Sequence, residues 1–209
     1  MKILLIRHGE TAGNRERRYV GRTDEPLSED GREKLLKQAV FWQTFLCVRA
    51  VITSPMARCT ETADILFPAE KFPDAERIVV SGLRECDFGD FEYKNYAELN
   101  GDPAYQRFLD SGGLEGFPGG ERIVDFKRRS VLAFEEMLEK YSGNSDDVSG
   151  DTLAFVIHGG SIMSILEALA YPKRGYYDWQ VKNGGGYLAS ACKKDGIWRI
   201  EEVCAATEI

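Results

Sequence analysis

The sequence predicts an α/β fold, a three-layer α/β/α sandwich with a mainly parallel central sheet. The apolar run at residues 3–6 is followed by Arg-His-Gly and the run at 153–157 by His-Gly, as in buried strands that end at the ligand-binding edge of a sheet. Strand-like segments alternate with segments of helical spacing, which predicts helices on both faces. With 209 residues, 43% hydrophobic content and no linker-like stretch, residues 1–209 are expected to form one domain.

Capping residues, prolines and apolar spacing define the elements of the first half. Ser28, followed by Gly31 and Glu33, is typical of a helix start, and Pro55 is tolerated in a first helical turn. The Gly- and Arg-rich segment before Ser28 predicts a loop. The expected order is a strand at 3–6, a loop at 9–27, a helix at 28–47, a strand at 50–53, a helix at 54–66 and a strand at 78–80.

The second half begins with an irregular segment, 83–121, that is rich in aromatic residues and glycine. Its part 86–121 is expected to be a helical and aromatic cap insertion over the site. The apolar spacing of Val124, Val131, Phe134 and Leu138 predicts a long helix after it. The expected order is short helices at 93–99 and 104–109, a helix at 123–141, a polar loop at 142–151, a strand at 153–157, a helix at 161–169 and strands at 187–191 and 197–203.

Charge and cysteine usage exclude several classes of protein. The formal charge is −7, from 34 acidic and 27 basic residues, which argues against a nucleic-acid or anionic-membrane binder. Five cysteines without a CxxC spacing predict thiols in a reducing compartment, with no disulfide or zinc framework. The first residues are strand-like and lack a signal-peptide core. We therefore expect a cytoplasmic protein with no membrane or nucleic-acid partner.

The two histidines carry the strongest chemical signal, because the chain has no others. Arg7 and His8 precede Gly9, and His158 precedes Gly159 and Gly160. Arg58 is predicted in the first turn of a helix, where the helix dipole also favours an anion. Glu85 adds a carboxylate. Phosphoryl transfer needs positioned positive charge, a nucleophile and a proton source, and these segments can supply all three.

These residues also carry a resemblance. The motifs LIRHGET at 5–11, GRTDEPL at 21–27, SPMAR at 54–58, LRE at 83–85 and HGG at 158–160 occur in the order and approximate spacing of the histidine phosphatase superfamily, which includes the phosphoglycerate mutases. The resemblance implies that His8 is the nucleophile and forms a phosphohistidine. It implies that Glu85 protonates the leaving alcohol and then activates water. It further implies a set of phosphate-binding residues: Arg7, Asn14, Thr23, Arg58, His158 and Gly159.

The residues themselves are compatible with these roles. A neutral imidazole is a competent nucleophile near pH 7, and flanking cations disfavour its protonation. No metal or other cofactor is expected, since two histidines without HExxH or a coupled cysteine pair do not make a zinc site. Burial would raise the pKa of Glu85 and nearby arginines would lower it, so the sequence leaves the direction open.

Alternatives exist for the individual residues. An isolated histidine is more often a hydrogen-bonded core residue, and arginines are usually surface ion-pair partners. Acidic residues are abundant, so Glu10, Asp87 or Glu92 could take the place of Glu85, while Asn14 and Thr23 could simply shape turns. Arg128 and Arg129 fall on the helix predicted at 123–141, where such a pair usually faces solvent.

The expected substrate is a small-molecule organic phosphate monoester. Between Glu85 and Glu121 the cations are Lys94 and Arg107, whereas seven aromatic residues occur there, which suits a ring-bearing alcohol better than phosphoglycerate. Phe88 stands where the mutases usually have tyrosine. The sequence thus resembles the phosphatase branch, including α-ribazole phosphatases. A phosphoglycerate mutase and a non-catalytic phosphate-binding protein are the alternatives, and the oligomeric state is not predicted.

Overall fold

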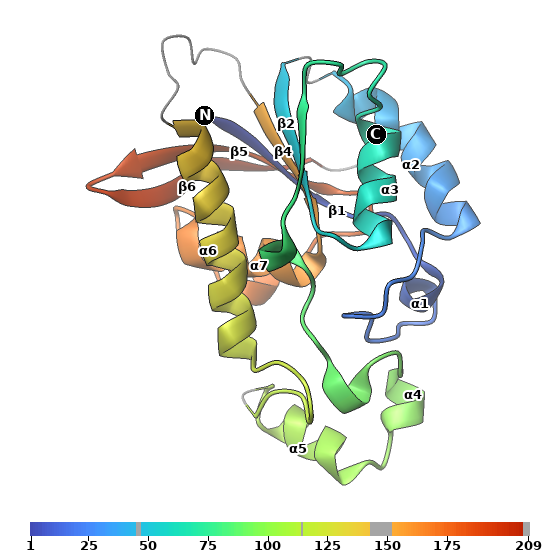
Figure 1. Cartoon of the computed structure of the whole chain (residues 1–209). Helices are drawn as coiled ribbons and strands as arrows, with labels where there is room; N and C mark the ends of the chain where they lie inside the picture. Colours follow the sequence, from blue (N-terminus) through green and yellow to red (C-terminus); the bar gives the residue numbers. More distant parts are fainter. Residues whose placement is uncertain (45–46, 114, 143–151, 207–209) are drawn as a thin grey trace.

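The computed structural model describes residues 1–209 except 45–46, 114, 143–151 and 207–209. At its centre the sheet has the strand order β3-β2-β4-β1-β5-β6 (Figure 1). Strands β3, β2, β4 and β1 run parallel, and β5 and β6 add to this sheet as antiparallel strands. The strands are β1 (Lys2–Arg7), β2 (Val48–Thr53), β3 (Glu76–Val79), β4 (Thr152–Ile157), β5 (Gly186–Lys194) and β6 (Ile197–Ala206). The predicted mainly parallel sheet is confirmed.

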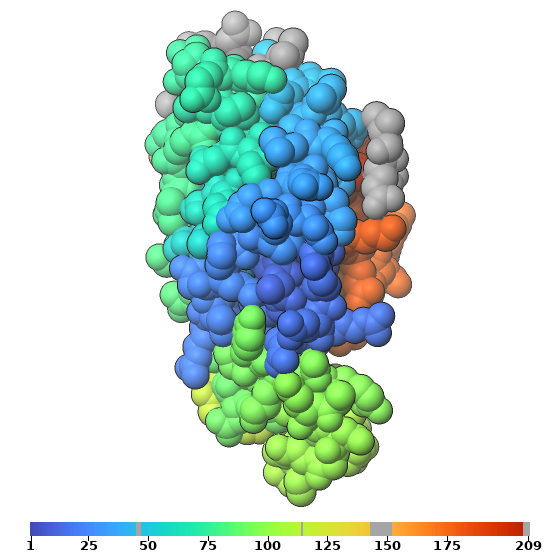
Figure 2. Space-filling view, turned by 90° about the vertical axis from the view of Figure 1, so that its right-hand side faces the viewer, coloured from blue at the N-terminus to red at the C-terminus, as the bar shows by residue number. Residues whose placement is uncertain are grey.

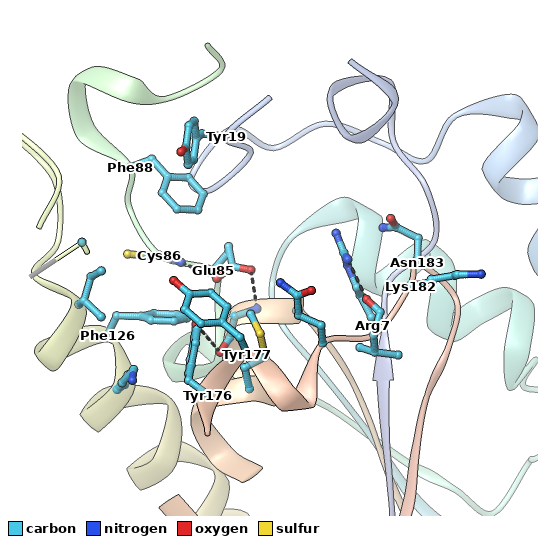
Figure 3. A pocket seen from close by; sticks show the side chains of 18 of the residues that line it. Arg7, Tyr19, Glu85, Cys86, Phe88, Phe126, Tyr176, Tyr177, Lys182 and Asn183 are labelled. Carbon is cyan, nitrogen blue, oxygen red and sulfur yellow. Dashed lines mark hydrogen bonds between the residues drawn. The ribbon is translucent and has the colours of Figure 1, made fainter. Parts of the chain in front are cut away.

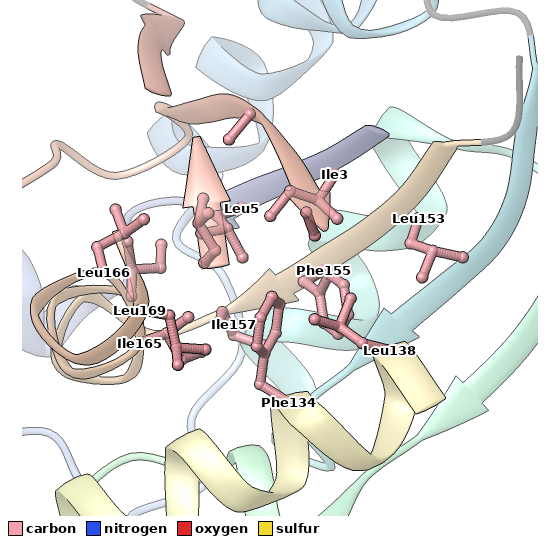
Figure 4. Close-up of a cluster of buried hydrophobic side chains, with 14 of the residues drawn as sticks. Ile3, Leu5, Phe134, Leu138, Leu153, Phe155, Ile157, Ile165, Leu166 and Leu169 are labelled. Atoms are coloured by element: carbon pink, nitrogen blue, oxygen red, sulfur yellow. The ribbon is translucent and has the colours of Figure 1, made fainter. Parts of the chain in front are cut away.

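Both faces of the sheet are covered by helices. Ile3 and Leu5 of β1 face a core shared with α6 (Ile123–Ser142) and α7 (Gly159–Leu169), which Figure 4 shows. Leu4 and Ile6 face the opposite core, shared with α2 (Glu29–Trp42) and α3 (Ala57–Leu66). All four strand residues are fully buried, which explains why the run is continuously apolar. The predicted three-layer sandwich is confirmed.

The predicted cap, residues 86–121, holds short helices and its own small apolar cluster. It contains η2 (Gly89–Phe91), α4 (Tyr96–Leu99) and α5 (Pro103–Asp110). Asp102 caps α5 through its carboxylate, and Pro103 occupies the first turn, where its missing N–H costs nothing. Helices α4 and α5 lie beyond the end of the sheet and project from the molecule (Figures 1 and 2).

Several element boundaries differ from the sequence prediction. The loop predicted at 9–27 contains α1 (Ala12–Arg15), a single turn held by a capping box between Thr11 and Asn14. The helix predicted to reach Cys47 ends at Trp42. Pro55 precedes α3 rather than entering its first turn, because Met56 is the N-cap residue.

Two further differences concern the second half. Helix α7 begins at Gly159, two residues earlier than predicted, since the strand ends directly at Ile157. The single-turn helices η1 (Ser81–Leu83) and η3 (Tyr176–Trp179) were not predicted, because one turn leaves no apolar period to detect. The polar loop predicted at 142–151 begins at the last residue of α6, and its remainder lies outside the described residues.

Candidate active site

The carboxyl ends of β1 and β4 bring the two histidines together. Arg7 pairs with Ile157 in the parallel register, so His8 and His158 follow paired strand ends. The backbone N–H of His8 donates to the carbonyl oxygen of Ile157 at 2.9 Å. The ring centroids lie 5.2 Å apart with the planes at 67°. The predicted meeting of the two imidazoles at one edge of the sheet is therefore observed.

The tautomer of His8 is fixed by its own neighbour. Its Nδ1 lies 2.7 Å from the carbonyl oxygen of Gly9, and a carbonyl can only accept, so Nδ1 carries the proton and Nε2 keeps a lone pair. Burial, together with the positive charges of Arg58 and Arg7, holds the pKa of His8 well below its ordinary value. His8 is thus a neutral imidazole with a nucleophilic nitrogen at neutral pH.

His158 is enclosed by side chains that follow β2. Its Nε2 lies 2.8 Å from the hydroxyl oxygen of Ser54 and 3.6 Å from the sulfur of Cys59. Burial raises the pKa of the Cys59 thiol to about 12, so that sulfur stays protonated. Burial and the nearby Arg58 lower the pKa of His158. The second imidazole is therefore also neutral and held in place from one side.

Arg58 lies in the first turn of α3, as predicted, and is fully buried. Its Nη1 donates to the carbonyl oxygen of Thr23 and its Nη2 to that of Gly21, both at 2.8 Å. Asp24 accepts the N–H of Ala57 at the start of the same helix, so that N–H is not free for an anion. The Arg58 Nε is buried and has no hydrogen-bond partner among the described residues.

Arg7 shows the same pattern at the end of β1. Its Nη1 donates to the carbonyl oxygen of Val181 at 2.9 Å, while its buried Nε has no acceptor among the described residues. Buried guanidinium donors without acceptors are rare in folded proteins. Both unpartnered Nε groups belong to arginines whose charge acts on His8, which makes this site suited to an anion.

Glu85, directly before the cap, bonds to the turn that follows His158. Its Oε1 accepts the N–H of Cys86 at 3.0 Å and its Oε2 the N–H of Gly160 at 3.2 Å. Burial raises the pKa of this carboxyl group, against the opposing effects of these N–H donors and of Arg58 and Arg7. The direction that the sequence left open is therefore upward, as suits a proton donor.

The other candidate carboxylates are engaged elsewhere. Glu10 pairs with Lys34 and Arg15 at the surface. Asp87 accepts the N–H of Gly89. Glu92 accepts the backbone N–H groups of Gly21, Thr23 and Phe88, and so ties the loop after α1 to the cap. Of the four carboxylates, Glu85 is the one that bonds to the HGG turn.

The remaining predicted phosphate ligands lie around this centre in different ways. The Asn14 side-chain oxygen accepts from the amide of Asn183 at 2.9 Å, which leaves its own NH2 group as a donor. Thr23 contributes its carbonyl oxygen to Arg58, so its observed contact is structural. Gly159 lines the cavity, and a Cβ there would lie 3.4 Å from the Arg7 Nε. No described contact tests the role of Asn14, Thr23 or Gly159 toward phosphate.

Two residues that were not predicted as site residues complete the site. Asn183 donates to the carbonyl oxygens of His8 and Gly9, which holds the loop that fixes the His8 tautomer. Arg129, expected on a solvated face, instead donates to backbone carbonyls beside Glu85. Both act through tertiary contacts to backbone, which leave no local pattern; the asparagine before Gly184 was the one available signal.

A cavity of about 2140 Å³ opens over these groups (Figure 3). Arg7, Gly9, Gly159 and Glu85 line it, whereas His8, which lies between Arg7 and Gly9 in the chain and is 4% exposed, is not among the lining residues. In the figure, Glu85 lies between Arg7 on one side and Phe126 with Tyr176 on the other. Within the described residues, no group of three or more His, Cys, Asp or Glu could hold a metal ion, and no helix could cross a membrane.

Comparisons with known proteins agree with this geometry. A 2,3-bisphosphoglycerate-dependent phosphoglycerate mutase of Gloeobacter violaceus is 31% identical over 175 residues, 80% of this chain and 74% of its own. The structure of a mycobacterial glucosyl-3-phosphoglycerate phosphatase in complex with VO3 superposes with a TM-score of 0.79 at 26% identity, covering 99% of both chains. The α-ribazole phosphatase of Shigella flexneri shares the fold, with a TM-score of 0.78 at 21% identity over 96% of this chain and 94% of its own.

The family assignment rests on nearly the whole chain. Residues 3–203 match the model of the histidine phosphatase superfamily, branch 1. The match includes the strand ends that deliver both histidines, the helix that carries Arg58 and the segment that carries Glu85. The chain therefore belongs to the histidine phosphatase superfamily.

Proposed function

We propose that this protein is a metal-independent phosphatase that hydrolyses an organic phosphate monoester through a phosphohistidine at His8. One observation carries the proposal: the tautomer of His8 leaves the lone pair on Nε2, and the buried Nε groups of Arg7 and Arg58 have no acceptor among the described residues. An incoming phosphoryl group would supply those acceptors. Charge-assisted hydrogen bonds from guanidinium groups are among the strongest that a protein offers to phosphate.

The first chemical step transfers the phosphoryl group. Nε2 of His8 bonds to phosphorus as the bond to the alcohol oxygen breaks, and the proton of Glu85 moves to that oxygen. The raised pKa of Glu85 favours the protonated form that this step needs. Arg7, Arg58 and His158 hold the phosphoryl oxygens.

The second step regenerates the enzyme. The Glu85 carboxylate takes a proton from water as the water oxygen bonds to phosphorus, and the phosphorus–nitrogen bond breaks. Inorganic phosphate leaves, Glu85 is protonated again, and the proton on Nδ1 of His8 has not moved.

The position of Glu85 sets the direction of the leaving alcohol. An acid that protonates the alcohol oxygen lies between the phosphate and the rest of the alcohol, so the alcohol extends from Arg7 past Glu85. Of the lining residues, Phe88, Phe126 and Tyr177 lie on that side of the cavity (Figure 3), and Phe117 packs against Phe88. We propose a ring-bearing alcohol there, with the monoester α-ribazole 5′-phosphate as the first substrate to test.

The charges around the cavity differ in part from the sequence expectation. Lys94 and Arg107 of the cap are not among the lining residues, but five cations from outside the cap line the cavity in addition to Arg7: Lys34, Lys37, Arg122, Lys127 and Lys182. Lys34, Arg122 and Lys127 pair with Glu10, Asp125 and Glu167. Lys182 lies on the Arg7 side of the cavity, away from the alcohol path (Figure 3).

A phosphoglycerate mutase is the second candidate, because relatives about 30% identical bear that name. Such an enzyme would hold a carboxylate as well as a phosphate, and the lining cations could serve that purpose. The aromatic alcohol side favours the phosphatase. A phosphate-binding protein without catalysis is disfavoured, since the nucleophile and the proton donor are both in place.

The test is phosphate release in EDTA from α-ribazole 5′-phosphate, phenyl phosphate, sugar phosphates, nucleotides and 3-phosphoglycerate. The proposal predicts release that peaks on a ring-bearing monoester. Phe88→Ala should raise the KM for that ring-bearing monoester about tenfold and leave the KM for glycerol phosphate unchanged. Tyr96→Ala is the matched control, because Tyr96 is exposed on the same cap and is not among the residues that line the cavity. Isomerisation of phosphoglycerate that outpaces hydrolysis would instead establish the mutase.

The proposal also covers the partners and the cellular location of the enzyme. The substrate is a small-molecule phosphate ester and no nucleic acid or membrane takes part, in line with the net charge of −7. The five cysteines, none of the described ones in a disulfide, suit a cytoplasmic enzyme. Fractionation of cells that express the tagged protein would test this location.

A further inference from the structure

Arg129 of α6 contacts the segment that carries Glu85 through several hydrogen bonds. Its Nη1 donates to the carbonyl oxygens of Gly82 at 2.8 Å and Arg84 at 2.9 Å, and its Nη2 to that of Glu85 at 3.3 Å. One guanidinium group therefore holds three carbonyls within four residues. The side chain is 20% exposed, so water competes little for these bonds.

The same guanidinium group also binds the far end of the cap. Its Nε and Nη2 pair with the two carboxylate oxygens of Glu121 at 2.9 and 2.7 Å, a two-point ion pair. The backbone N–H of Glu121 donates to the carbonyl oxygen of Asp87 at 2.9 Å. Arg129 thus joins the segment where the cap begins to the residue where it ends.

These contacts bear on the proton donor itself. The Glu85 carboxylate is aimed at Gly160 by weak single bonds to two N–H groups, so its position depends on where its backbone is held. Arg129 fixes that backbone from behind the cavity wall: it is not among the lining residues, and its guanidinium carbon lies 5.2 Å from the ring centroid of Phe126, which is. A lysine could replace it only in part, because one ammonium group cannot span the carbonyls and the carboxylate together.

We propose that Arg129, with Glu121, is a positioning residue that couples the seating of the cap to the placement of Glu85 for proton transfer. The inference rests on the proposed function, in which Glu85 protonates the leaving oxygen. If so, variants of Arg129 should lose more kcat/KM on substrates whose leaving oxygen needs protonation than on substrates whose leaving group departs without it. A purely structural role would lower kcat/KM on all substrates by the same factor.

The experiment compares kcat/KM for phenyl phosphate and 4-nitrophenyl phosphate, which are similar in size but differ in their need for an acid. Arg129→Met should lower kcat/KM about tenfold or more on phenyl phosphate and much less on 4-nitrophenyl phosphate. Arg129→Lys and Glu121→Gln should show the same bias, a larger loss on phenyl phosphate than on 4-nitrophenyl phosphate, to a smaller extent. Arg128→Met, the exposed neighbour on the same helix, is the control and should change neither value.

The bias should disappear in a Glu85→Gln background, because a residue that acts through the acid has nothing left to position. Equal losses on both substrates, or a bias that persists without Glu85, would overturn the inference. If Arg129→Met does not fold, Arg129→Lys and Glu121→Gln carry the comparison.

Failure of the proposed function would be seen separately, as wild-type protein that releases phosphate from neither compound. Amide hydrogen exchange of Cys86, whose N–H bonds to the Glu85 carboxylate, then tests the coupling without catalysis. Exchange should be faster in Glu121→Gln than in wild type and unchanged in Arg128→Met. Unchanged exchange in Glu121→Gln would contradict the inference.

Discussion

The imidazole of His8 lies 5.2 Å from that of His158, measured between ring centroids, and both rings are neutral. The buried positive charges of Arg7 and Arg58 act on both, so protonating either ring would add a third cation to one small site. The positive charge available to bind phosphate is therefore carried by the two guanidinium groups and not by the imidazoles. It also makes the folded protein sensitive to acid.

Lowering the pH below about 6.5 should destabilise the protein through these two rings. The unfolded chain takes up protons there and the folded state does not, because the folded pKa values lie well below that of a free histidine. Each ring can lower the free energy of unfolding by up to about 1 kcal/mol between pH 6.5 and 5.5, because a free imidazole is already half protonated at the upper value. Urea unfolding at pH 6.5 and 5.5 should show that the double variant His8→Gln/His158→Gln loses less unfolding free energy on acidification than the wild type does. An equal loss would contradict the assignment of lowered pKa values to these two rings.

Substitution of Glu85 should alter the alkaline side of the pH profile. The donor must be protonated, so kcat/KM should fall as the pH rises through the raised pKa of Glu85. Glu85→Gln should lower kcat/KM on phenyl phosphate about 10²-fold or more and abolish that fall. The same variant should be more stable than wild type at neutral pH, since the raised pKa opposes folding once the unfolded carboxyl ionises. An unchanged alkaline limb would rule out Glu85 as the donor.

Adjacent glycines of the HGG motif should tolerate alanine very differently. A Cβ at Gly160 would lie 2.5 Å from Oε1 of Glu85, whereas one at Gly159 would make ordinary contact with Arg7. Gly160→Ala should therefore displace the acid and lower kcat/KM about tenfold or more on phenyl phosphate. Gly159→Ala should keep most activity and gain up to about 1 kcal/mol of helix stability at α7. Equal activity in the two variants would show that Glu85 is free to move.

The two arginines should contribute unequally to stability. Arg58→Met leaves the carbonyl oxygens of Gly21 and Thr23 without their donor and should lower the unfolding free energy by about 3 kcal/mol. Arg7→Met removes one bond, to Val181, and should cost about 1–2 kcal/mol. Both should lower kcat/KM. Denaturant unfolding that ranks them in the opposite order would contradict the structural role given to Arg58.

The sheet and the meeting of the histidines could be predicted from sequence because both depend on local patterns. Strands buried on both faces are continuously apolar, as at Ile3 and Leu5, and the residue after each strand falls at the same edge. The places of Arg7, Arg58 and Glu85 relative to the histidines followed from that rule and from the family resemblance. The motif residues thus lie close together in the structure.

What the sequence missed depends on contacts between distant segments. Arg129 has the helical spacing of a surface residue, and its carbonyl partners lie 44 to 47 residues away. Asn183 reaches His8 across 175 residues. The cations that line the cavity likewise come from α2, from α6 and the residue before it, and from the segment before β5, rather than from the cap. The direction of the Glu85 pKa shift required the burial that the fold creates.

Rapid quench of the enzyme with a 32P-labelled substrate tests whether His8 accepts the phosphoryl group. The label should be stable to alkali, labile to acid and located on the peptide that contains His8, and it should be absent from His8→Ala, whose turnover falls by at least about 10³-fold. Wild-type turnover by His8→Ala, or label on another residue, would contradict this role of His8.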